Sequence, residues 1–494
     1  MWLTQLLERN LQCRPGRTAL VDEERSVTWA EFHDRTLELA CGLAELGIER
    51  GDRVAVLSKD RIEVLESYFA LARLGALFVP LNHSLAGPEI AGIVERVGAV
   101  AVLGESELLD RHPELPASVR IRLAFDKPAF AALGTLTAGR DLPDVADTDP
   151  VAVLHTSATT GQAKGVTVDS ASLRAIALGW LVMARPTDDI VMVNCCPLYH
   201  GSMVVSLTYL AAGATVVLMP GFTPQRALSA VERHRATHMW LVPQMLRFML
   251  QARASHRADL SSLREVLYGA APMPLDVYAD AVERLGCGFR QVYGMTEVGG
   301  PFVTLGPDEH PAPGDVTARI PCGRVVPGMS ARVVDEDGRE LPRGGTGEIV
   351  VRGPGVMRGY WNDPEATREI TLDGWIRTGD LGFMDDGGRI SLVDRAKDVI
   401  IRAGQNVYPS EIERALMTHP AVRDAAVVGT PDEDYGEVPL AYVALEPDAE
   451  ADTAALLAHV AGLLAPYKRP RRVEFIEQVP RNPAGKIVKK LLRV

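Results

Sequence analysis

Short apolar runs alternate with amphipathic helical patterns over the first three hundred or so residues of the chain. The clearest units are a helix over residues 28–46, a strand over 53–58, a helix over 64–74 and a strand over 76–80. A glycine follows each of the two helices, which is the usual signal for a helix C-terminus. Repeated units of this kind predict an α/β fold of mostly parallel sheets covered by helices.

The pattern changes after about Gly306, where short strands and turns rich in Gly and Pro dominate. Strands are expected at residues 331–335, 347–352 and 389–394, which predicts a small β-rich subdomain. Helices and strands then alternate again, with helices expected over 409–417 and 453–464 and strands over 425–429 and 441–445. We therefore place an N-terminal domain at residues 1–394, a hinge at 395–398 and a C-terminal domain at 399–494.

One stretch between two of these elements has the composition of a phosphate-binding loop. Residues 151–154 are apolar and predict a buried strand, and hydroxyl, glycine and lysine residues follow at once. Together they offer hydroxyls, bare backbone N–H groups and an ammonium to the oxygens of a polyphosphate. Neither the Walker pattern GxxxxGK[ST] nor the dinucleotide pattern GxGxxG is present. A Ser/Thr-rich surface loop is the alternative. The candidate residues are Thr156, Ser157, Thr159, Thr160, Gly161 and Lys164.

Composition narrows the class of protein. The chain has 494 residues, 47% of them hydrophobic and 23% charged, which is typical of a soluble globular protein. A net charge of −12 with no basic block argues against a nucleic-acid surface. The six cysteines form no CxxC pair, so free thiols in a reducing cytoplasm are expected. No signal peptide is visible, and the longest apolar region, residues 204–218, is interrupted by polar residues, so we expect no integral membrane segment.

The candidate loop resembles the phosphate loop of the adenylate-forming superfamily. It departs from the superfamily pattern twice, with Ala158 in place of a glycine and Ala163 in place of a proline. Further stretches match the superfamily in chain order, in particular its acyl-CoA synthetase and coumarate-CoA-ligase-like members. They are NCCPLYH at 194–200, YGAAP at 268–272, QVYGMTE at 291–297, DGWIRTGD at 373–380, VDRAKD at 393–398, RAGQNVYP at 402–409 and PRNPAGK at 480–486.

The resemblance implies a nucleotide site. Tyr293 would stack on adenine, Thr296 would contact phosphate, Glu297 would hold Mg²⁺, Asp380 would accept the ribose hydroxyls and Arg395 would contact the nucleotide. These roles suit the residue types, because a hard cation prefers oxygen ligands and an ionised carboxyl group only accepts hydrogen bonds. Other residues of the matched segments complete the expected site: Gly269, Ala270, Ala271, Pro272, Gly294 and Met295.

The resemblance also implies a large N-terminal domain of two α/β sheets and a small β-barrel, followed by a smaller mobile α+β C-terminal domain. Lys397 would be the hinge, Gly404 would line the tunnel for coenzyme A, and Lys486 would bridge carboxylate and phosphate during adenylation. His200 would lie beside the carboxylate of the acid. The residues expected to be catalytic are Lys486, His200, Glu297 and Thr160.

The implied activity is ATP-dependent activation of a small carboxylic acid to an acyl-adenylate and transfer to coenzyme A, which makes the chain an AMP-forming acid–thiol ligase. The expected acid pocket is apolar and partly aromatic, so it suits an aryl, cinnamyl-type or medium-chain acid. Its residues are His200, Trp240, Tyr268, Gly269, Met295 and Gly299. Three alternatives stay open: transfer to a carrier protein, a non-thiol reaction such as nitrite activation for diazotisation of an aryl amine, and a relative that binds without catalysis.

Overall fold

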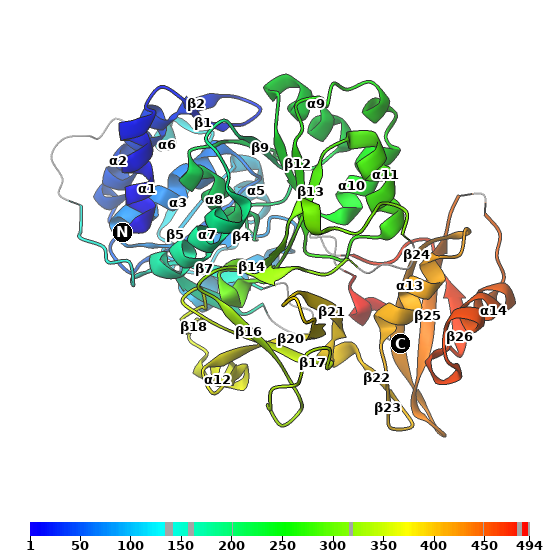
Figure 1. The fold of residues 1–494 in the computed structure, drawn as a ribbon. Coiled ribbons are helices and arrows are strands. Elements are labelled where there is room, and N and C mark those ends of the chain that lie inside the picture. Colours follow the sequence, from blue (N-terminus) through cyan, green and yellow to red (C-terminus); the bar gives the residue numbers. More distant parts are fainter. Residues whose placement is uncertain are drawn as a thin grey trace. The chain divides into compact units, whose positions relative to one another are not determined.

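The computed structural model describes residues 1–133, 142–156, 163–199, 201–315, 320–447, 449–481 and 487–492. They form two compact units (Figure 1). The first unit contains the described residues up to Ser330 together with Arg352–Ile376. The second contains Ala331–Val351 and the described residues from Arg377 onward.

The first large sheet of the first unit has nine strands in the described part of the chain, in the order β15-β14-β13-β12-β11-β9-β10-β1-β2. Its central strands are parallel, and antiparallel pairs occur at both edges. The strands are β1 Thr18–Val21, β2 Ser26–Thr28, β9 Val191–Asn194, β10 Thr215–Leu218, β11 His238–Leu241, β12 Glu265–Gly269, β13 Gly288–Met295, β14 Gly300–Leu305 and β15 Arg324–Val325.

The second large sheet has seven strands among the described residues, in the order β18-β8-β7-β4-β3-β5-β6. Strands β3 to β7 pair in parallel, and β8 turns back antiparallel to β7. The strands are β3 Arg53–Leu57, β4 Leu77–Leu81, β5 Ala101–Gly104, β6 Ile121–Ala124, β7 Pro150–His155, β8 Gly165–Asp169 and β18 Gly359–Tyr360. A short strand β19, Thr371–Leu372, pairs with Trp375 and Ile376.

Helices cover both sheets. The described helices of this unit are α1 Trp2–Cys13, α2 Trp29–Glu45, α3 Ile62–Leu74, α4 Gly87–Val97, α5 Ser106–Arg111, α6 Pro128–Ala132, α7 Ser170–Ala184, α8 Ser202–Ala212, α9 Pro224–His234, α10 Pro243–Gln251, α11 Leu275–Leu285 and α12 Pro364–Glu369. Helices α9 to α11 share a core with β9, β11 and β12, while α7 and α8 pack on strands of the nine-stranded sheet from its other side. Helix α4 covers one face of the seven-stranded sheet, and α3 packs on the other through Tyr68 and Phe78, whose ring centroids are 5.0 Å apart.

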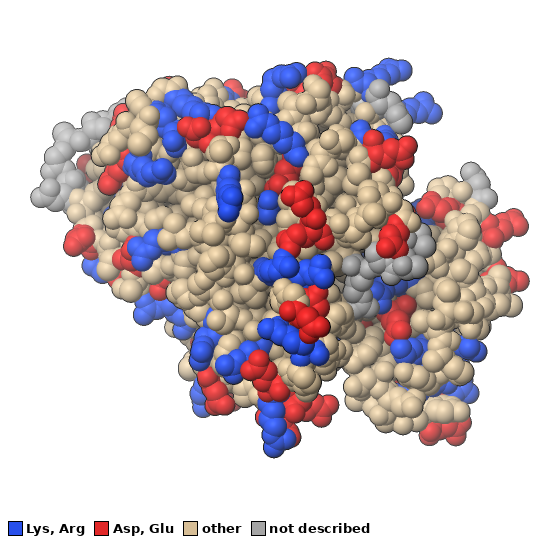
Figure 2. Space-filling view, viewed as in Figure 1, with Lys and Arg blue, Asp and Glu red and all other residues tan. Residues whose placement is uncertain are grey.

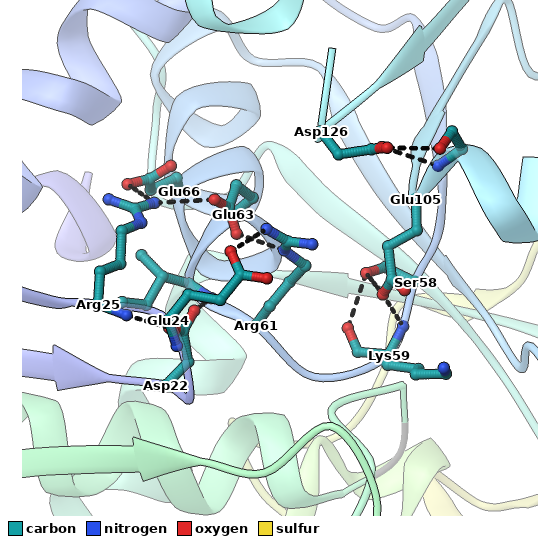
Figure 3. A network of polar contacts seen from close by, with 12 residues as sticks. Asp22, Glu24, Arg25, Ser58, Lys59, Arg61, Glu63, Glu66, Glu105 and Asp126 are labelled. Atoms are coloured by element: carbon teal, nitrogen blue, oxygen red, sulfur yellow. Dashed lines mark hydrogen bonds and ion pairs between the residues drawn. The ribbon is translucent and has the colours of Figure 1, made fainter.

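Helix α3 is mostly apolar and is buried along almost its whole length. Both of its acidic residues, Glu63 and Glu66, are also in the interior. Arg25 pairs with Glu66 at 2.8 Å and Glu63 at 3.1 Å, and Arg61 pairs with Glu63 at 2.6 Å (Figure 3). These arginines keep the buried carboxylates from being unpaired charges.

The second unit contains two smaller sheets. One is built from β16 Ser330–Val334, β17 Gly347–Arg352, β20 Trp375–Met384 and β21 Ile390–Arg395. The other has the order β23-β22-β25-β24, with β26 beside β25, and packs against helices α13 and α14. Its elements are β22 Ile400–Arg402, β23 Gln405–Val407, α13 Pro409–Met417, β24 Val422–Asp432, β25 Gly436–Leu445, α14 Thr453–Leu463 and β26 Arg472–Phe475.

The predicted α/β class is confirmed, and each helix and strand that the pattern predicted has a counterpart in the structure. The predicted domain boundary at residues 395–398 falls inside the second unit, and the hinge itself stays a prediction. No helix in the described ranges is long and apolar enough to cross a membrane. On the face seen in Figure 2, basic and acidic side chains are interspersed.

Candidate functional site

The predicted phosphate loop joins the antiparallel strands β7 and β8, whose last ladder pair is His155 and Gly165. Thr156 N–H donates to the carbonyl oxygen of Lys164 at 3.0 Å, and Lys164 N–H donates to Thr156 Oγ1 at 3.3 Å. These two bonds fasten the ends of the loop together. Burial lowers the pKa of His155 to about 4, so this ring is neutral at pH 7.

The loop residues between these ends lie outside the described residues. The roles predicted for Ser157, Thr159, Thr160 and Gly161 therefore stay predictions, as does the effect of Ala158. His200 and Lys486 also lie outside the described residues, so their catalytic roles stay predictions as well.

Lys164 lies beside an aromatic residue that the sequence analysis did not select. Its Nζ is 5.0 Å from the ring centroid of Tyr360 and 3.9 Å from Glu369 Oε2. The side chain is 40% exposed, so its ammonium is available to solvent and to an anion. This cation–π contact holds the ammonium close to strand β18 and thereby restricts where its charge can lie.

The same tyrosine holds the predicted magnesium ligand. Tyr360 O–H donates to Glu297 Oε1 at 2.8 Å, and Met357 N–H donates to the carbonyl oxygen of Glu297 at 2.9 Å. Glu297 is 9% exposed and lies in a single 3₁₀ turn, Thr296–Val298, that ends at Gly299 with φ +67°. Burial and the neighbouring carboxylate raise the pKa of Tyr360, so its hydroxyl stays protonated and remains a donor.

The structure thus brings together Glu297 and Lys164, two of the predicted site residues, around Tyr360. Tyr360 was missed because its contact with Glu297 spans 63 positions of the chain. The available signal was the position of an amphipathic aromatic residue directly after Gly359, in a stretch otherwise interpreted as turns.

The residue predicted to stack on adenine lies near the end of strand β13. Tyr293 is 8% exposed and packs against Phe302 of β14, with ring centroids 5.1 Å apart. At the next position only glycine fits, because a Cβ on Gly294 would lie 2.3 Å from the carbonyl oxygen of Gly300. Met295 ends the strand and leads directly into the turn that carries Thr296 and Glu297.

A second predicted loop begins where β12 ends. A Cβ on Gly269 would lie 2.4 Å from the carbonyl oxygen of Val292 and 3.2 Å from the indole ring of Trp240. The next residue, Ala270, has φ +64°, which is unusual for a residue with a side chain and is often found at functional sites. Ala270 and Pro272 are exposed, and Ala271 is half-buried between them.

The predicted acid pocket is brought together only in part. Trp240 pairs with Leu267 in the parallel ladder, whereas Leu241 pairs with Tyr268. Side chains alternate between the faces of a strand, so Trp240 and Tyr268 point to opposite faces of the sheet. Tyr268 lies in the core with Leu241, and its hydroxyl is 3.2 Å from Gln291 Oε1 and 2.9 Å from His310 Nε2.

A buried carboxyl group that the sequence analysis did not select contacts the segment before the predicted substrate histidine. Asp60 Oδ1 accepts a hydrogen bond from Leu198 N–H at 2.9 Å, two positions before residue 200. Burial raises the pKa of Asp60 to about 8. Asp60 is therefore a positioning residue for the segment that leads to His200.

In the second unit, the predicted ribose ligand has a cationic partner. Asp380 and Arg395 face each other across the ladder of β20 and β21, and Arg395 Nε lies 2.8 Å from Asp380 Oδ1. Asp380 is 5% exposed. The predicted hinge residue Lys397 follows at once in the 3₁₀ turn Ala396–Asp398.

Gly404, predicted to line a tunnel, lies in the turn between β22 and β23. Its φ is +78°, and a Cβ there would have no atom within 4 Å. The position therefore opens onto free space within its own unit.

Within the described part of the chain, no group of three or more His, Cys, Asp or Glu residues could hold a metal on its own. Glu297 can supply one oxygen ligand. This arrangement fits Mg²⁺, which usually keeps waters and substrate phosphates as its other ligands.

Comparison with known proteins decides the family. The AMP-binding enzyme family matches residues 7–361, and the AMP-binding enzyme C-terminal domain matches residues 411–486. The chain belongs to the AMP-binding enzyme family. Among curated relatives of this AMP-binding enzyme, a feruloyl-CoA synthase of Amycolatopsis is 37% identical over 97% of this chain and 96% of its own length. The fatty acid–[acyl-carrier-protein] ligase ScoC of Streptomyces coeruleorubidus is 35% identical over 99% of this chain and 96% of its own length.

Solved structures agree. The crystal structure of ATP-bound MatB from Rhodopseudomonas palustris is 31% identical, covers 99% of this chain and 98% of its own, and has a TM-score of 0.92. The predicted enzyme class, an AMP-forming acid–thiol ligase, is confirmed by the family and by these relatives. The two family matches and the MatB structure also confirm the predicted fold, in which a large N-terminal domain is followed by a smaller C-terminal domain.

Proposed function

We propose that this AMP-binding enzyme activates an aryl, cinnamyl-type or medium-chain carboxylic acid with ATP and transfers the acyl group to coenzyme A in the cytoplasm. The observation that carries the proposal is the buried carboxylate of Glu297, held by Tyr360 inside a segment that resembles the superfamily's magnesium-binding motif. One carboxylate oxygen held in a fixed position suits Mg²⁺, which takes its other ligands from water and the phosphates of ATP.

The reaction has two steps. A carboxylate oxygen of the acid attacks the α-phosphorus of ATP, the bond between the α-phosphorus and the bridging oxygen breaks, and pyrophosphate leaves. The thiol sulfur of coenzyme A then attacks the acyl carbon, loses its proton and displaces AMP. Bound Mg²⁺ supplies charge neutralisation in the first step, and Glu297 would hold it.

Residues of this chain orient the reactants in the proposal. Lys164 steadies the phosphates with the loop residues Ser157 and Thr160, Tyr293 offers its face to adenine, and Asp380 accepts the ribose hydroxyls. Lys486 bridges carboxylate and phosphate during adenylation and is withdrawn when the C-terminal domain turns about Lys397. Gly404 then leaves room for the pantetheine chain.

The names of relatives support an aromatic acid. A feruloyl-CoA synthase and an indoleacetate–CoA ligase each cover nearly the whole chain at 37% and 35% identity. We place the acid beside His200, Met295 and Gly299, with Trp240 as an aromatic wall next to Gly269.

Transfer to a carrier protein is the second candidate. It is favoured by the similarity to ScoC, whose name states a carrier-protein acceptor and which is 35% identical over 99% of this chain. Free coenzyme A and a phosphopantetheinyl carrier protein therefore both belong in the test.

The test is a pyrophosphate-release screen with MgATP over cinnamate-type, aryl and aliphatic acids, followed by product analysis with coenzyme A or carrier protein. We expect release with a subset of acids and an acyl-CoA product. A Lys486→Ala variant should lose pyrophosphate release but still transfer the acyl group from supplied acyl-adenylate. Lys490→Ala is the matched control, because this exposed lysine lies four positions away.

Release without acyl-CoA formation, together with acylation of the carrier protein, would replace the first candidate with the second. Absence of release with every acid would refute both. Equal loss of both half-reactions in Lys486→Ala would refute the proposal that Lys486 acts in adenylation and is withdrawn before acyl transfer.

A further inference from the structure

Four buried polar atoms beside the nine-stranded sheet have no hydrogen-bond partner within the described residues. They are Asn194 Nδ2, Trp240 Nε1, Ser206 Oγ and Tyr209 O–H. Buried polar groups are nearly always paired, so four on adjacent elements call for an explanation. The strands that carry them are β9 and β11, and the helix is α8.

The two strand residues are neighbours on one face of the sheet. Asn194 and Trp240 are register partners in the parallel ladder of β9 and β11. Asn194 has no exposed surface, and Trp240 is 6% exposed. Val193 and Met239, the residues before them, point to the other face, where they share the core with helices α9 to α11.

Helix α8 packs on the face of the sheet that carries these two residues. It connects the parallel neighbours β9 and β10, so it must run antiparallel to them. The ring of Tyr209 lies 5.7 Å from that of His238, at the start of β11. One helical turn before Tyr209, about 4.5 Å along the axis, comes Ser206. Two strand positions after His238, about 6.6 Å in the same direction, comes Trp240.

The four polar residues Asn194, Trp240, Ser206 and Tyr209 form a polar layer, and this layer adjoins the proposed acid pocket. The indole ring of Trp240 lies 3.2 Å from the place where a Cβ on Gly269 would be, at the beginning of the loop with strained Ala270. Val204 of α8 lies 3.0 Å from the corresponding position on Gly300. The proposed adenylate site is at the carboxyl ends of these strands, where Asn194 is the last residue of β9 and Trp240 the second to last residue of β11.

We propose that Asn194 and Trp240 recognise a hydrogen-bond acceptor oxygen on the part of the acid that is remote from its carboxylate. The inference rests on the proposed function and narrows its substrate class to acids with a hydroxyl or carbonyl oxygen at that end. Both groups are donors, and an indole N–H and an amide N–H require an acceptor. Ser206 can donate to the same oxygen or accept its proton.

Such a site discriminates strongly, since an analogue without the oxygen leaves the buried donors unpaired. The experiment therefore compares matched acids that differ only in that oxygen: 4-hydroxycinnamate with 4-methylcinnamate, 4-hydroxyphenylacetate with 4-methylphenylacetate, and 10-hydroxydecanoate with undecanoate. The quantity measured is the ratio of kcat/KM for pyrophosphate release within each pair. We expect a ratio of about ten or more for at least one pair in the native protein.

Three variants test which residues cause the preference for the acid that carries the oxygen. Asn194→Leu and Trp240→Phe each remove one donor and keep much of the volume, and both should lower the ratio several-fold. Thr208→Val is the matched control on α8, because its hydroxyl already donates to the carbonyl oxygen of Val204 at 2.9 Å. Its ratio should equal that of the native protein. Circular dichroism and melting curves confirm folding of each variant.

Ratios near one in the native protein for every pair with activity would overturn the inference while leaving the proposed function intact. Ratios that Asn194→Leu and Trp240→Phe leave unchanged would show that these two donors do not meet the acid, and would also overturn it. No pyrophosphate with any acid would instead remove the proposed function and this inference together.

Discussion

The hydroxyl group of Tyr360 donates a 2.8 Å hydrogen bond to the carboxylate of Glu297, from a strand 63 positions further along the chain. The same ring lies 5.0 Å from the ammonium of Lys164. One aromatic side chain therefore orients a carboxylate proposed to hold a cation and a lysine proposed to bind phosphate. Its removal should disturb both without removing either charge.

Tyr360→Phe keeps the ring beside Lys164 and deletes the donor to Glu297. A hydrogen bond to a charged group contributes about 1.5–3 kcal/mol, so we expect the KM for MgATP to rise about tenfold. Glu297→Gln should have a larger effect, mainly on kcat, because it removes the charge itself. Pyrophosphate release at varied MgATP measures both.

Tyr442→Phe is the control for this experiment. Tyr442 lies in strand β25 of the second unit, and its hydroxyl has no partner within the part of the chain that the structure describes. Its loss should leave the KM for MgATP unchanged. An unaltered KM in Tyr360→Phe would show that Glu297 needs no donor and would remove Tyr360 from the site.

The local sequence pattern predicted the helices and strands well, but it did not predict which distant residues contact one another. The helix expected over residues 409–417 is α13, Pro409–Met417, and the strand expected over 347–352 is β17, Gly347–Arg352. Hydrophobic periodicity and turn residues are local properties, so they fix such bounds. The contact between Tyr360 and Glu297 depends on how β18 is placed by β8, which no local period encodes.

The acid pocket shows a different limit. The expected acid pocket grouped Trp240 with Tyr268, yet the ladder turns the two side chains to opposite faces. Alternation within a strand is predictable, but the register between two strands is set by tertiary packing. The roles of His200, Thr160 and Lys486 stay predictions from resemblance, since these residues lie outside the described ranges.

The ion pair of Arg395 with Asp380 gives a second prediction. Arg395→Met leaves a carboxylate that is 5% exposed without this partner. Because the arginine side chain is 47% exposed, water screens the pair, and we expect a loss of about 1 kcal/mol in the free energy of unfolding. AMP should also bind several-fold more weakly, since Arg395 is proposed to contact the nucleotide. Melting curves with and without AMP measure both effects.

Arg389→Met is the matched change in the same hairpin. Arg389 pairs with Asp385 at 2.7 Å, and their side chains are 41% and 30% exposed. We expect little change in melting temperature and none in AMP binding. A loss of AMP affinity of equal size in both variants would mean that Arg395 acts only through general stability.

A substitution at Gly404 should affect one half-reaction and spare the other. Gly404→Leu should slow acyl transfer to coenzyme A at least tenfold while pyrophosphate release continues, because the proposed tunnel is used only in the second step. Gly388→Leu is the control: Gly388 has φ +75° and, like Gly404, no atom near its would-be Cβ. Both substitutions carry the same backbone strain, of about 1 kcal/mol. Equal effects of the two on transfer would contradict the tunnel assignment.

Asp60 predicts how stability depends on pH. Burial raises the pKa of its carboxyl group from 3.8 to about 8 in the folded protein, so between these values the folded state binds a proton that the unfolded state has released. Stability therefore falls as pH rises across this range, by up to about 1.4 kcal/mol per pH unit from this group. Asp60→Asn removes the titrating group and retains an oxygen that can accept from Leu198 N–H.

The variant should therefore gain in melting temperature relative to the native protein as pH rises from 5.5 to 8. Melting curves of both proteins at half-unit pH intervals measure the difference. Two parallel curves would show that Asp60 carries the same charge in the folded and the unfolded protein over this interval, and would place its folded-state pKa near the unfolded value. A gain confined to low pH would require a depressed pKa, the opposite of what its burial produces.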